Sequence, residues 1–289
     1  MRSLRRSAAL LAALLLASCA PEPVPADPAI WLVEGPGGQK AWLFGTIHGL
    51  ERPALWKTPP VAQALGAADT VIVEVAGLED AGAMAKTFKE LAHRPGQPPL
   101  ADRVRPGLRK GLSKMLAEGG LEAGAFADVE TWAAALTLAR AASSKAKSEY
   151  GIDRAILAEA QDKRLVELEG AAGQLGIFDK LPEREQRDLL EAVIADTGAP
   201  GGGSAELAAA WRKGDMAPIE AATRRGLLAD RELRAVLFTA RNRRWSGRVQ
   251  REMEAGIRPF VAVGAAHMAG PDGLPALLEA QGYAVTRLR

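Results

Sequence analysis

The chain has 289 residues, of which 48% are apolar, 25% charged and 5% aromatic. This composition excludes a disordered or collagen-like protein and supplies enough apolar residues for the core of one large domain. The formal net charge of +2, from 37 basic and 35 acidic side chains, lacks the basic excess that is typical of a nucleic-acid-binding protein.

Residues 1–18 have the features of a bacterial secretory signal peptide. Three arginines in the first six residues precede an uncharged apolar run at 8–17, which is too short for a permanent membrane span. The run ends in Leu-Ala-Ser-Cys at 16–19, which resembles a lipobox, where the chain is cut before a cysteine that carries a diacylglyceryl group. Cys19 is the only cysteine, so intramolecular disulfides are excluded. An ordinary signal peptide with a chance cysteine is the alternative interpretation.

The processed chain is near-neutral, with 34 basic and 35 acidic side chains remaining after residue 18. Residues 19–29 are Pro-rich, which is typical of an extended tether, and the domain is expected over 30–289. Acyl chains on Cys19 would anchor this domain to a membrane, since each buried CH₂ contributes about 0.8 kcal/mol. We therefore expect a cell-envelope protein that faces the periplasm. Ala20, in place of the Asp that commonly retains lipoproteins at the inner membrane, favours the outer membrane.

The rest of the chain predicts strands that bracket helices. Strands are expected at 30–34, 41–44, 70–75, 164–169, 259–263 and 283–288. Helices are expected at 60–67, 131–142, 152–162, from Pro182 onward, at about 230–255 and at 274–280, with a surface link at 198–204. This order predicts an α/β fold with a mixed, largely parallel sheet flanked by helices, in which residues of about 79–160 form a helical cap.

Two of the three histidines follow the same local pattern, an apolar strand and then Gly-x-x-His. The first unit ends at His48 and the second at His267. The glycine allows a sharp turn, and the histidine then projects over the carboxyl end of the strand, the edge where α/β sheets bind ligands. A lone histidine in such a place is usually structural, but two can face one another across one crevice. His93 has no such setting, and we interpret it as a surface residue.

Glu74 lies in the β-branched run 71–75, where an ionised carboxylate is costly to bury without a partner. A metal ion or a histidine cation would offset this cost, and an exposed strand end is the alternative. Glu169 raises the same question at the end of 165–169. In the long helix, Asn242 falls in an apolar stripe, so its amide needs a hydrogen-bond partner, and Arg241 borders that stripe.

Taken together, these residues resemble the TraB/GumN family, which includes the Tiki proteases and is distantly related to the erythromycin esterase and ChaN-like folds. The resemblance extends from Trp31 to Leu288. It rests on the two Gly-x-x-His units, Val71–Glu74, Gly151–Asp153, Leu168-Glu169 with Gln174, Arg241-Asn242 and the closing segment 270–287. Met268 stands where the family more usually has Leu, a mild departure.

The resemblance implies an α/β fold with both histidines and Glu74 at one site. In Tiki-like relatives this arrangement accompanies divalent-metal-dependent peptide hydrolysis, and other relatives bind or inactivate peptide pheromones. Two imidazoles and a carboxylate are a normal ligand set, so His48, Glu74 and His267 are candidate ligands for Mn, Co or Zn. Glu169, or Asn242 with Arg241, are candidates for orienting water or stabilising an oxyanion.

We therefore expect an envelope-anchored, metal-dependent peptidase or related hydrolase that acts on a peptide or small molecule and has no nucleic-acid partner. The alternatives are a non-catalytic lipoprotein that binds a peptide or small ligand, and a haem- or iron-binding protein with the paired histidines as axial ligands. The sequence contains neither a His-Glu-x-x-His helix nor a Gly-x-Ser-x-Gly turn. The common zinc-protease and serine-hydrolase signatures are therefore excluded.

Overall fold

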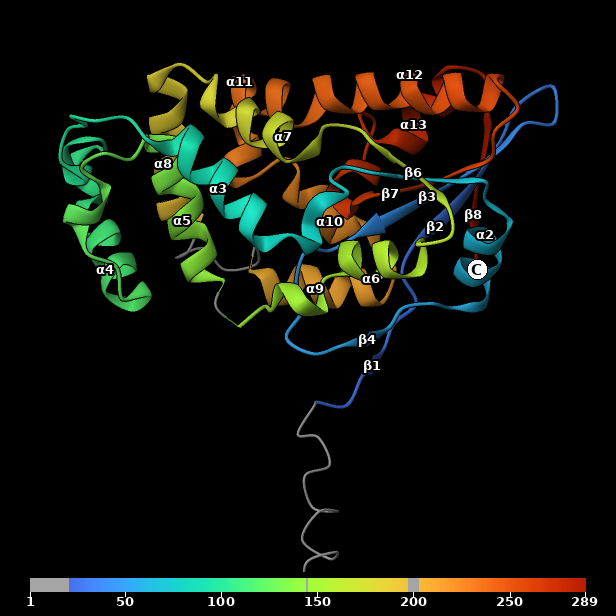
Figure 1. Ribbon diagram of the computed structural model, residues 1–289, viewed down its shortest axis with the longest axis horizontal. Coiled ribbons are helices and arrows are strands. Elements are labelled where there is room, and N and C mark those ends of the chain that lie inside the picture. The colour runs from blue at the N-terminus through green and yellow to red at the C-terminus, as the bar shows by residue number, and fades with distance from the viewer. Residues whose placement is uncertain (1–20, 144, 197–202) are drawn as a thin grey trace, which may run out of the picture.

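The computed structural model describes residues 21–143, 145–196 and 203–289 (Figure 1). The predicted signal peptide, the predicted lipidation site Cys19 and residues 198–202 of the predicted surface link lie outside this part of the chain. Among the described residues, no helix combines the length and the apolar character needed to cross a membrane.

A six-stranded mixed sheet is the centre of one half of the molecule, with the strand order β6-β5-β7-β3-β2-β8. The strands are β2 (Ile30–Glu34), β3 (Lys40–Thr46), β5 (Thr70–Val73), β6 (Arg164–Glu167), β7 (Pro259–Gly264) and β8 (Ala284–Leu288). The first four strands in the order run parallel, and β2 is antiparallel to both of its neighbours. The predicted α/β fold with a largely parallel sheet is confirmed.

The two strands that carry the Gly-x-x-His units are direct neighbours. β3 pairs in parallel with β7, and Thr46 lies opposite Gly264. Residues 70–73 of β5 and 259–263 of β7 are buried, as their continuous apolar character requires for strands covered on both faces. The sheet therefore brings both units to one edge, side by side.

Helices cover both faces of this sheet. One face packs against α2 (Pro59–Ala67), α6 (Ile152–Glu159), α9 (Ser204–Arg212) and α10 (Met216–Ala222). The other face packs against α12 (Ala240–Glu254) and α13 (Leu274–Ala280). Each face thus has its own apolar core.

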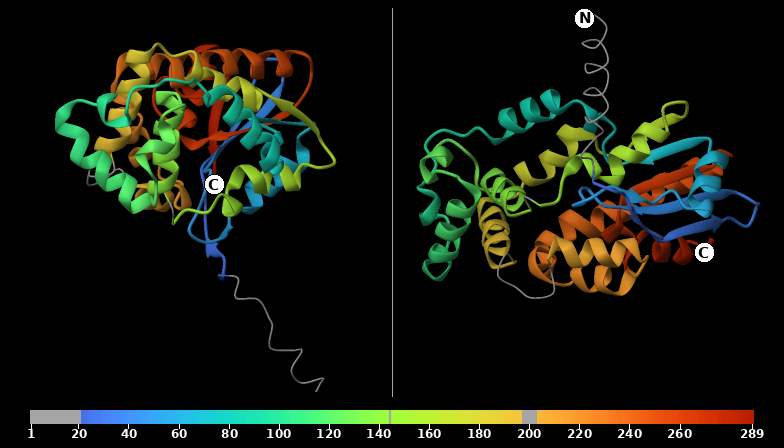
Figure 2. Two further views of the ribbon diagram at one scale, coloured as in Figure 1. Left: turned by 60° about the vertical axis from the view of Figure 1, so that its left-hand side comes forward. Right: turned by 90° about the horizontal axis from the view of Figure 1, so that it is seen from below.

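A second, helical half lies beside the sheet half (Figure 2). It consists of α3 (Ala81–Ala92), α4 (Arg109–Gly119), α5 (Thr131–Ala142), α7 (Gly170–Asp179) and α8 (Glu183–Asp196). These helices share a separate core around Trp132 and Leu189. This half differs from the predicted cap at 79–160, because α6 packs on the sheet while α7 and α8, which follow β6, complete the helical half.

One long helical segment connects the two halves (Figure 1). It begins with α11 (Arg231–Arg234), widens into a π-helical turn at Ala235–Thr239, and continues as α12. Leu233 packs in the core of the helical half, and Trp245 packs in the core under the sheet. The helix predicted at 230–255 is confirmed, and its π turn falls where the two halves meet.

The first described residues are docked on the domain. β1 (Val24–Pro25) pairs in parallel with β4 (Ala54–Leu55). The backbone N–H of Asp27 donates to the carbonyl of Arg212 over 2.7 Å. This part of the tether predicted at 19–29 is therefore held against the fold.

Candidate functional site

Four parallel strands end at one edge of the sheet, and the residues that follow them carry the candidate chemistry. The strands predicted at 70–75 and 164–169 end earlier, at Val73 and Glu167, so Glu74 and Glu169 follow their strands. The backbone N–H of Glu169 donates to the carbonyl of Glu74, which holds the two post-strand turns together. Both carboxylates are buried.

His48, Glu74 and His267 face a common space above Gly264. A Cβ built on Gly264 would lie 3.4 Å from Oε1 of Glu74, 3.7 Å from Cδ2 of His267 and 3.9 Å from Nε2 of His48. Because each atom is within 4 Å of one point, any two of them are less than 8 Å apart, which is below the separation of about 10 Å that would exclude binding to a shared ion. The absence of a side chain at Gly264 keeps this space open.

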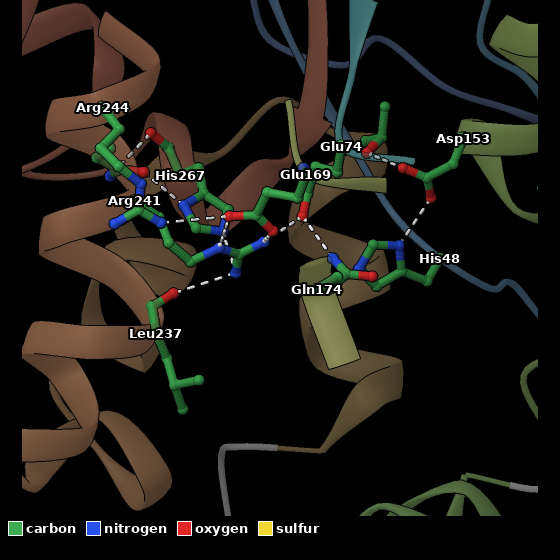
Figure 3. Close-up of polar contacts among 12 residues, drawn as sticks. His48, Glu74, Asp153, Glu169, Gln174, Leu237, Arg241, Arg244 and His267 are labelled. Carbon is green, nitrogen blue, oxygen red and sulfur yellow. Dashed lines mark hydrogen bonds and ion pairs between the residues drawn. The ribbon is translucent and has the colours of Figure 1, made fainter. Parts of the chain in front are cut away.

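His48 is oriented by a carboxylate from α6 (Figure 3). Its Nδ1 lies 2.8 Å from Oδ2 of Asp153, and the hydroxyl of Thr46 donates to the other carboxylate oxygen over 2.5 Å. The side chain of His48 is 74% exposed, whereas Asp153 is largely covered. The charge of Asp153 raises the pKa of His48 from 6.5 to about 9, and solvent at the open face of the ring screens part of this interaction.

Gly151 brings α6 against the His48 turn. A Cβ at Gly151 would lie 2.4 Å from the carbonyl oxygen of His48, too close for any other residue at this backbone position. The backbone N–H of Ile152 donates to the carbonyl of Ile47 over 2.9 Å, which fixes the start of the helix. Asp153 then lies in the first turn of α6, within reach of the imidazole.

His267 has the opposite environment. The ring is buried, with its centroid 5.4 Å from that of Phe238 and 4.5 Å from that of Trp245. Asn242 donates its amide N–H to the carbonyl of Asp272, so its Oδ1, 2.5 Å from Nδ1 of His267, accepts the imidazole proton. Burial lowers the pKa of His267 to about 4. The ring is therefore neutral at pH 7, with the lone pair on Nε2.

Arg241 joins the two buried carboxylates. Its guanidinium donates to Oε2 of Glu74 over 2.7 Å and to both oxygens of Glu169 over 2.8 and 2.7 Å. Glu74 also accepts from the backbone N–H of Gly264 and from the amide of Gln174. Burial opposes ionisation of Glu74, but the surrounding imidazoles, the guanidinium and the Gly264 hydrogen bond together lower its pKa. A fully bonded network thus offsets the cost of burying this charge.

The π turn contributes directly to this network. The carbonyl of Leu237, within the turn, accepts from Nη1 of Arg241 over 3.1 Å, and the guanidinium lies over the ring of Trp245 at 4.6 Å. Nη1 is also 3.4 Å from Nε2 of His267. π turns inside α-helices frequently occur at functional sites. Here the turn aims the guanidinium at the carboxyl ends of the strands.

The predicted site residues therefore divide into two groups. His48, Glu74, Arg241 and His267 line a cavity. Glu169 is bonded to Arg241 and Asn242 to His267, and their role in orienting water or stabilising an oxyanion stays a prediction. His93 is exposed at the end of α3, as predicted.

Three contacting residues were not among the predicted catalytic or metal-binding residues: Thr46, Asp153 and Gln174. The segments that contain these three residues are among those that resemble the family, and this resemblance was the one sequence feature that could have pointed to them. Their partners could not be read from spacing, since Asp153 and His48 are 105 residues apart and Gln174 and Glu74 are 100 apart.

Two hollows meet at these residues. The larger, about 550 Å³, lies between the sheet edge and the helices of both halves. The smaller, about 220 Å³, includes Ser148, Asp153 and Arg154. His48, Glu74 and Gln174 line both of them. A reacting group at these three side chains would therefore have space on two sides.

The donor atoms match a divalent cation in kind. Both histidines have their Nδ1 taken by an oxygen acceptor, which leaves Nε2 as the nitrogen for a metal, and such outer hydrogen bonds are typical of metal-binding histidines. Within the described ranges, no group of three or more His, Cys, Asp or Glu side chains is arranged so that it could hold a metal ion as it stands. Arg241 is bonded to Glu74, the carboxylate of the expected ligand set.

Comparisons with known proteins agree with the fold and the motifs. The chain is 28% identical over 247 residues to the uncharacterized protein YbaP of Shigella flexneri and, equally, to that of Escherichia coli (strain K12). Each alignment covers 84% of this chain and 89% of the relative. No solved structure matches the chain. A family model for the TraB/PrgY/gumN family matches residues 29–287. The chain belongs to the TraB/PrgY/gumN family.

Proposed function

We propose that the protein is an envelope-anchored hydrolase that cleaves a peptide or related small molecule with the help of a divalent metal ion. The observation that carries the proposal is the common space above Gly264, faced by two imidazoles and one carboxylate. His48, Glu74 and His267 would hold the ion, with Mn, Co and Zn as candidates. Such an ion, when bound, supplies Lewis-acid chemistry and lowers the pKa of water towards 7.

The side chains around the three candidate ligands have supporting tasks. Asp153 and Asn242 each accept the Nδ1 proton of one imidazole, so that Nε2 is the nitrogen left for the ion; Nε2 of His48 would release its proton when the ion binds. Arg241 keeps Glu74 ionised. Because the guanidinium is also paired with Glu169, it limits the movement of the Glu74 side chain. Gln174 contacts the same carboxylate from α7, in the helical half, and so connects the cavity wall to the reacting centre.

The hydrolase proposal is tested with the mature chain in detergent and a mixed peptide library. We expect cleavage after addition of Mn, Co or Zn, loss of cleavage with a chelator, and stoichiometric metal by elemental analysis. His48→Ala should lose both cleavage and metal, and His93→Ala should lose neither. Cleavage that survives exhaustive chelation would contradict the metal requirement, and failure to cleave any peptide with any of the three ions would contradict the hydrolase.

A non-catalytic binding protein is the second candidate. The ion pair between Arg241 and Glu74 favours it, because a buried network whose donors and acceptors satisfy one another can shape a pocket without performing chemistry. In that case a peptide would bind in the presence of a chelator, remain intact during prolonged incubation, and be released unchanged on unfolding.

The anchoring proposal rests on Cys19 and on the signal-like residues before it. Processing would attach the chain to the bacterial envelope, with the outer membrane favoured and the domain facing the periplasm. Cys19→Ser should abolish incorporation of labelled fatty acid and leave a precursor or a released form. Equal labelling of the variant and the wild type would refute lipidation at this residue.

A further inference from the structure

The larger hollow is an apolar chamber built where the two halves meet. Its walls come from α5, α7, α9, α10 and the 3₁₀ turn Gly226–Ala229. The apolar wall residues are Leu136, Leu175, Phe178, Leu207, Ile219 and Leu228. Its polar end is the sheet edge with His48, Glu74, Arg241 and His267. A chamber of about 550 Å³ is within the usual size range of small-molecule sites.

The polar side chains within the wall are already bonded to the protein. Trp211 donates its indole N–H to the carbonyl of Gly45 over 2.8 Å, and Thr223 donates its hydroxyl to the carbonyl of Glu220 over 2.8 Å. Away from the sheet edge, the wall therefore presents mainly carbon to a ligand. A charged or strongly polar group in this part of the chamber would lose its hydration without gaining partners.

The smaller hollow is less than half as large as the chamber, and its lining is mixed, with Val73, Val75 and Leu78 beside polar side chains. It includes the hydroxyl-bearing Ser148 and the guanidinium-bearing Arg154, whose side chain is partly exposed and pairs loosely with Glu79 at 3.5 Å. Two of the three proposed metal ligands, His48 and Glu74, line both hollows. An extended ligand can therefore place one group on each side of His48 and Glu74, with the large apolar chamber on one side and the smaller hollow of mixed lining on the other.

We propose that the site selects a peptide bond, or a similar amide, that joins a residue with a large apolar side chain to a residue with a small side chain. The large apolar side chain occupies the chamber of about 550 Å³, and the small residue occupies the hollow of about 220 Å³. This inference rests on the proposed hydrolase. Water is the co-reactant: the C–N bond breaks, the carbonyl carbon gains the hydroxyl, and the leaving nitrogen gains the proton.

The test uses the mature chain and four peptides, acetyl-Gly-X-Ser-Gly-amide with X as Ala, Val, Leu or Phe. Binding is measured by calorimetry with a chelator present, and cleavage is measured in parallel by mass spectrometry with Mn, Co or Zn. We expect the dissociation constant to fall about fourfold for each added CH₂ between Ala and Leu. Replacing Ser by Leu in the Ala peptide should give a much smaller gain.

Two adjacent alanines of α10 supply a matched pair of variants. Ala222 lines the chamber and is half-buried, whereas Ala221 is exposed and faces away. Ala222→Leu should reduce the preference for Leu over Ala peptides at least tenfold, and Ala221→Leu should leave it unchanged. Leu228→Ala, which enlarges the chamber, should shift the preference from Leu towards Phe. Circular dichroism verifies that each variant is folded.

The outcomes separate this inference from the function on which it rests. Equal affinity for all four peptides, or equal effects of the Ala221 and Ala222 variants, would overturn the apolar-chamber assignment even if the peptides were cleaved. Graded affinity that depends on Ala222, without cleavage under any of the three ions, would support the chamber and refute the hydrolase.

Discussion

The two Gly-x-x-His units have the same backbone pattern on neighbouring strands, but their histidines differ in charge. His48 is open to solvent and bonded to the carboxylate of Asp153, which favours the imidazolium. His267 is enclosed by aromatic rings and bonded to the amide of Asn242, which favours the neutral ring. The repeated motif therefore positions the imidazole, and a partner from a distant helix decides its protonation.

The largest loss of stability is expected from a substitution of Arg241, which lies next to His267 and pairs with both buried carboxylates. Arg241→Ala leaves Glu74 and Glu169 buried without their cation, which should lower the free energy of unfolding by about 3–5 kcal/mol. Urea unfolding measures this change. Arg244→Ala is the control on the same helix, because Arg244 is 59% exposed and 3.6 Å from Glu169. A comparable loss in both variants would show that the buried network is not specific to Arg241.

Replacing each histidine by alanine should lower the free energy of unfolding by different amounts in the two Gly-x-x-His units. His267→Ala removes a ring packed against Phe238 and Trp245, with an expected loss of about 2–4 kcal/mol. His48→Ala removes an exposed ring and should cost less than about 1 kcal/mol. Both should abolish the proposed hydrolysis. Calorimetric unfolding beside a cleavage assay checks this, and equal destabilisation would contradict the contrast in packing.

Gly151→Ala should disturb the contact between His48 and Asp153 without replacing either histidine. The new Cβ would meet the carbonyl oxygen of His48, so the start of α6 and Asp153 must move, at an expected cost of about 1–3 kcal/mol. Hydrolysis should fall because the imidazole loses its orienting carboxylate. Gly66→Ala is the control, since Gly66 lies in α2 with open space around its Cβ position and the change should stabilise by about 0.5–1 kcal/mol. Full activity of Gly151→Ala would exclude a positioning role for Asp153.

The smallest effect is a pH dependence of opposite sign for the two histidines in chelator-treated protein. The raised pKa of His48 gives stability that is present below about pH 6.5 and lost as the pH rises towards 9. The lowered pKa of His267 means that stability falls as the pH drops from about 6.5 towards 4, because only the unfolded chain takes up the proton.

Urea unfolding at a series of pH values between about 5 and 9 measures both slopes. Asp153→Asn removes the charge that raises the pKa of His48, and it should flatten the alkaline slope while leaving the slope below pH 6.5 in place. A variant that flattens the acidic slope instead would reverse the assignment of the two histidines.

Much of the sheet half could be predicted from local patterns. Continuous apolar runs indicated β5 and β7, and the Gly-x-x-His units indicated the edge where side chains converge. These features depend on residues that are close in sequence. Parallel pairing then brings Thr46 opposite Gly264, so the convergence of His48 and His267 follows from the strand order.

The partners of the site residues could not be predicted in the same way. Asp153 reaches His48 only because α6 docks against the His48 turn, and Arg241 reaches Glu74 only because a π turn joins α11 to α12. Both contacts depend on the packing of distant helices. From the sequence, a buried Glu74 was expected to need a counter-charge from a metal ion or a histidine. Arg241, which supplies this charge, was predicted only to border the apolar stripe of the long helix.

The docking of β1 on β4 limits how far the domain can travel from a lipid anchor. Val24 is already fixed to the fold through its pairing with Ala54. Five residue steps separate it from Cys19, a reach of at most roughly 18 Å for an extended chain. With Cys19 in the bilayer, as proposed, the domain would be held close to the membrane. Its chamber would then meet only molecules that come close to the membrane surface. Ligands would be bound from a thin layer of solution next to the membrane and not from the whole compartment.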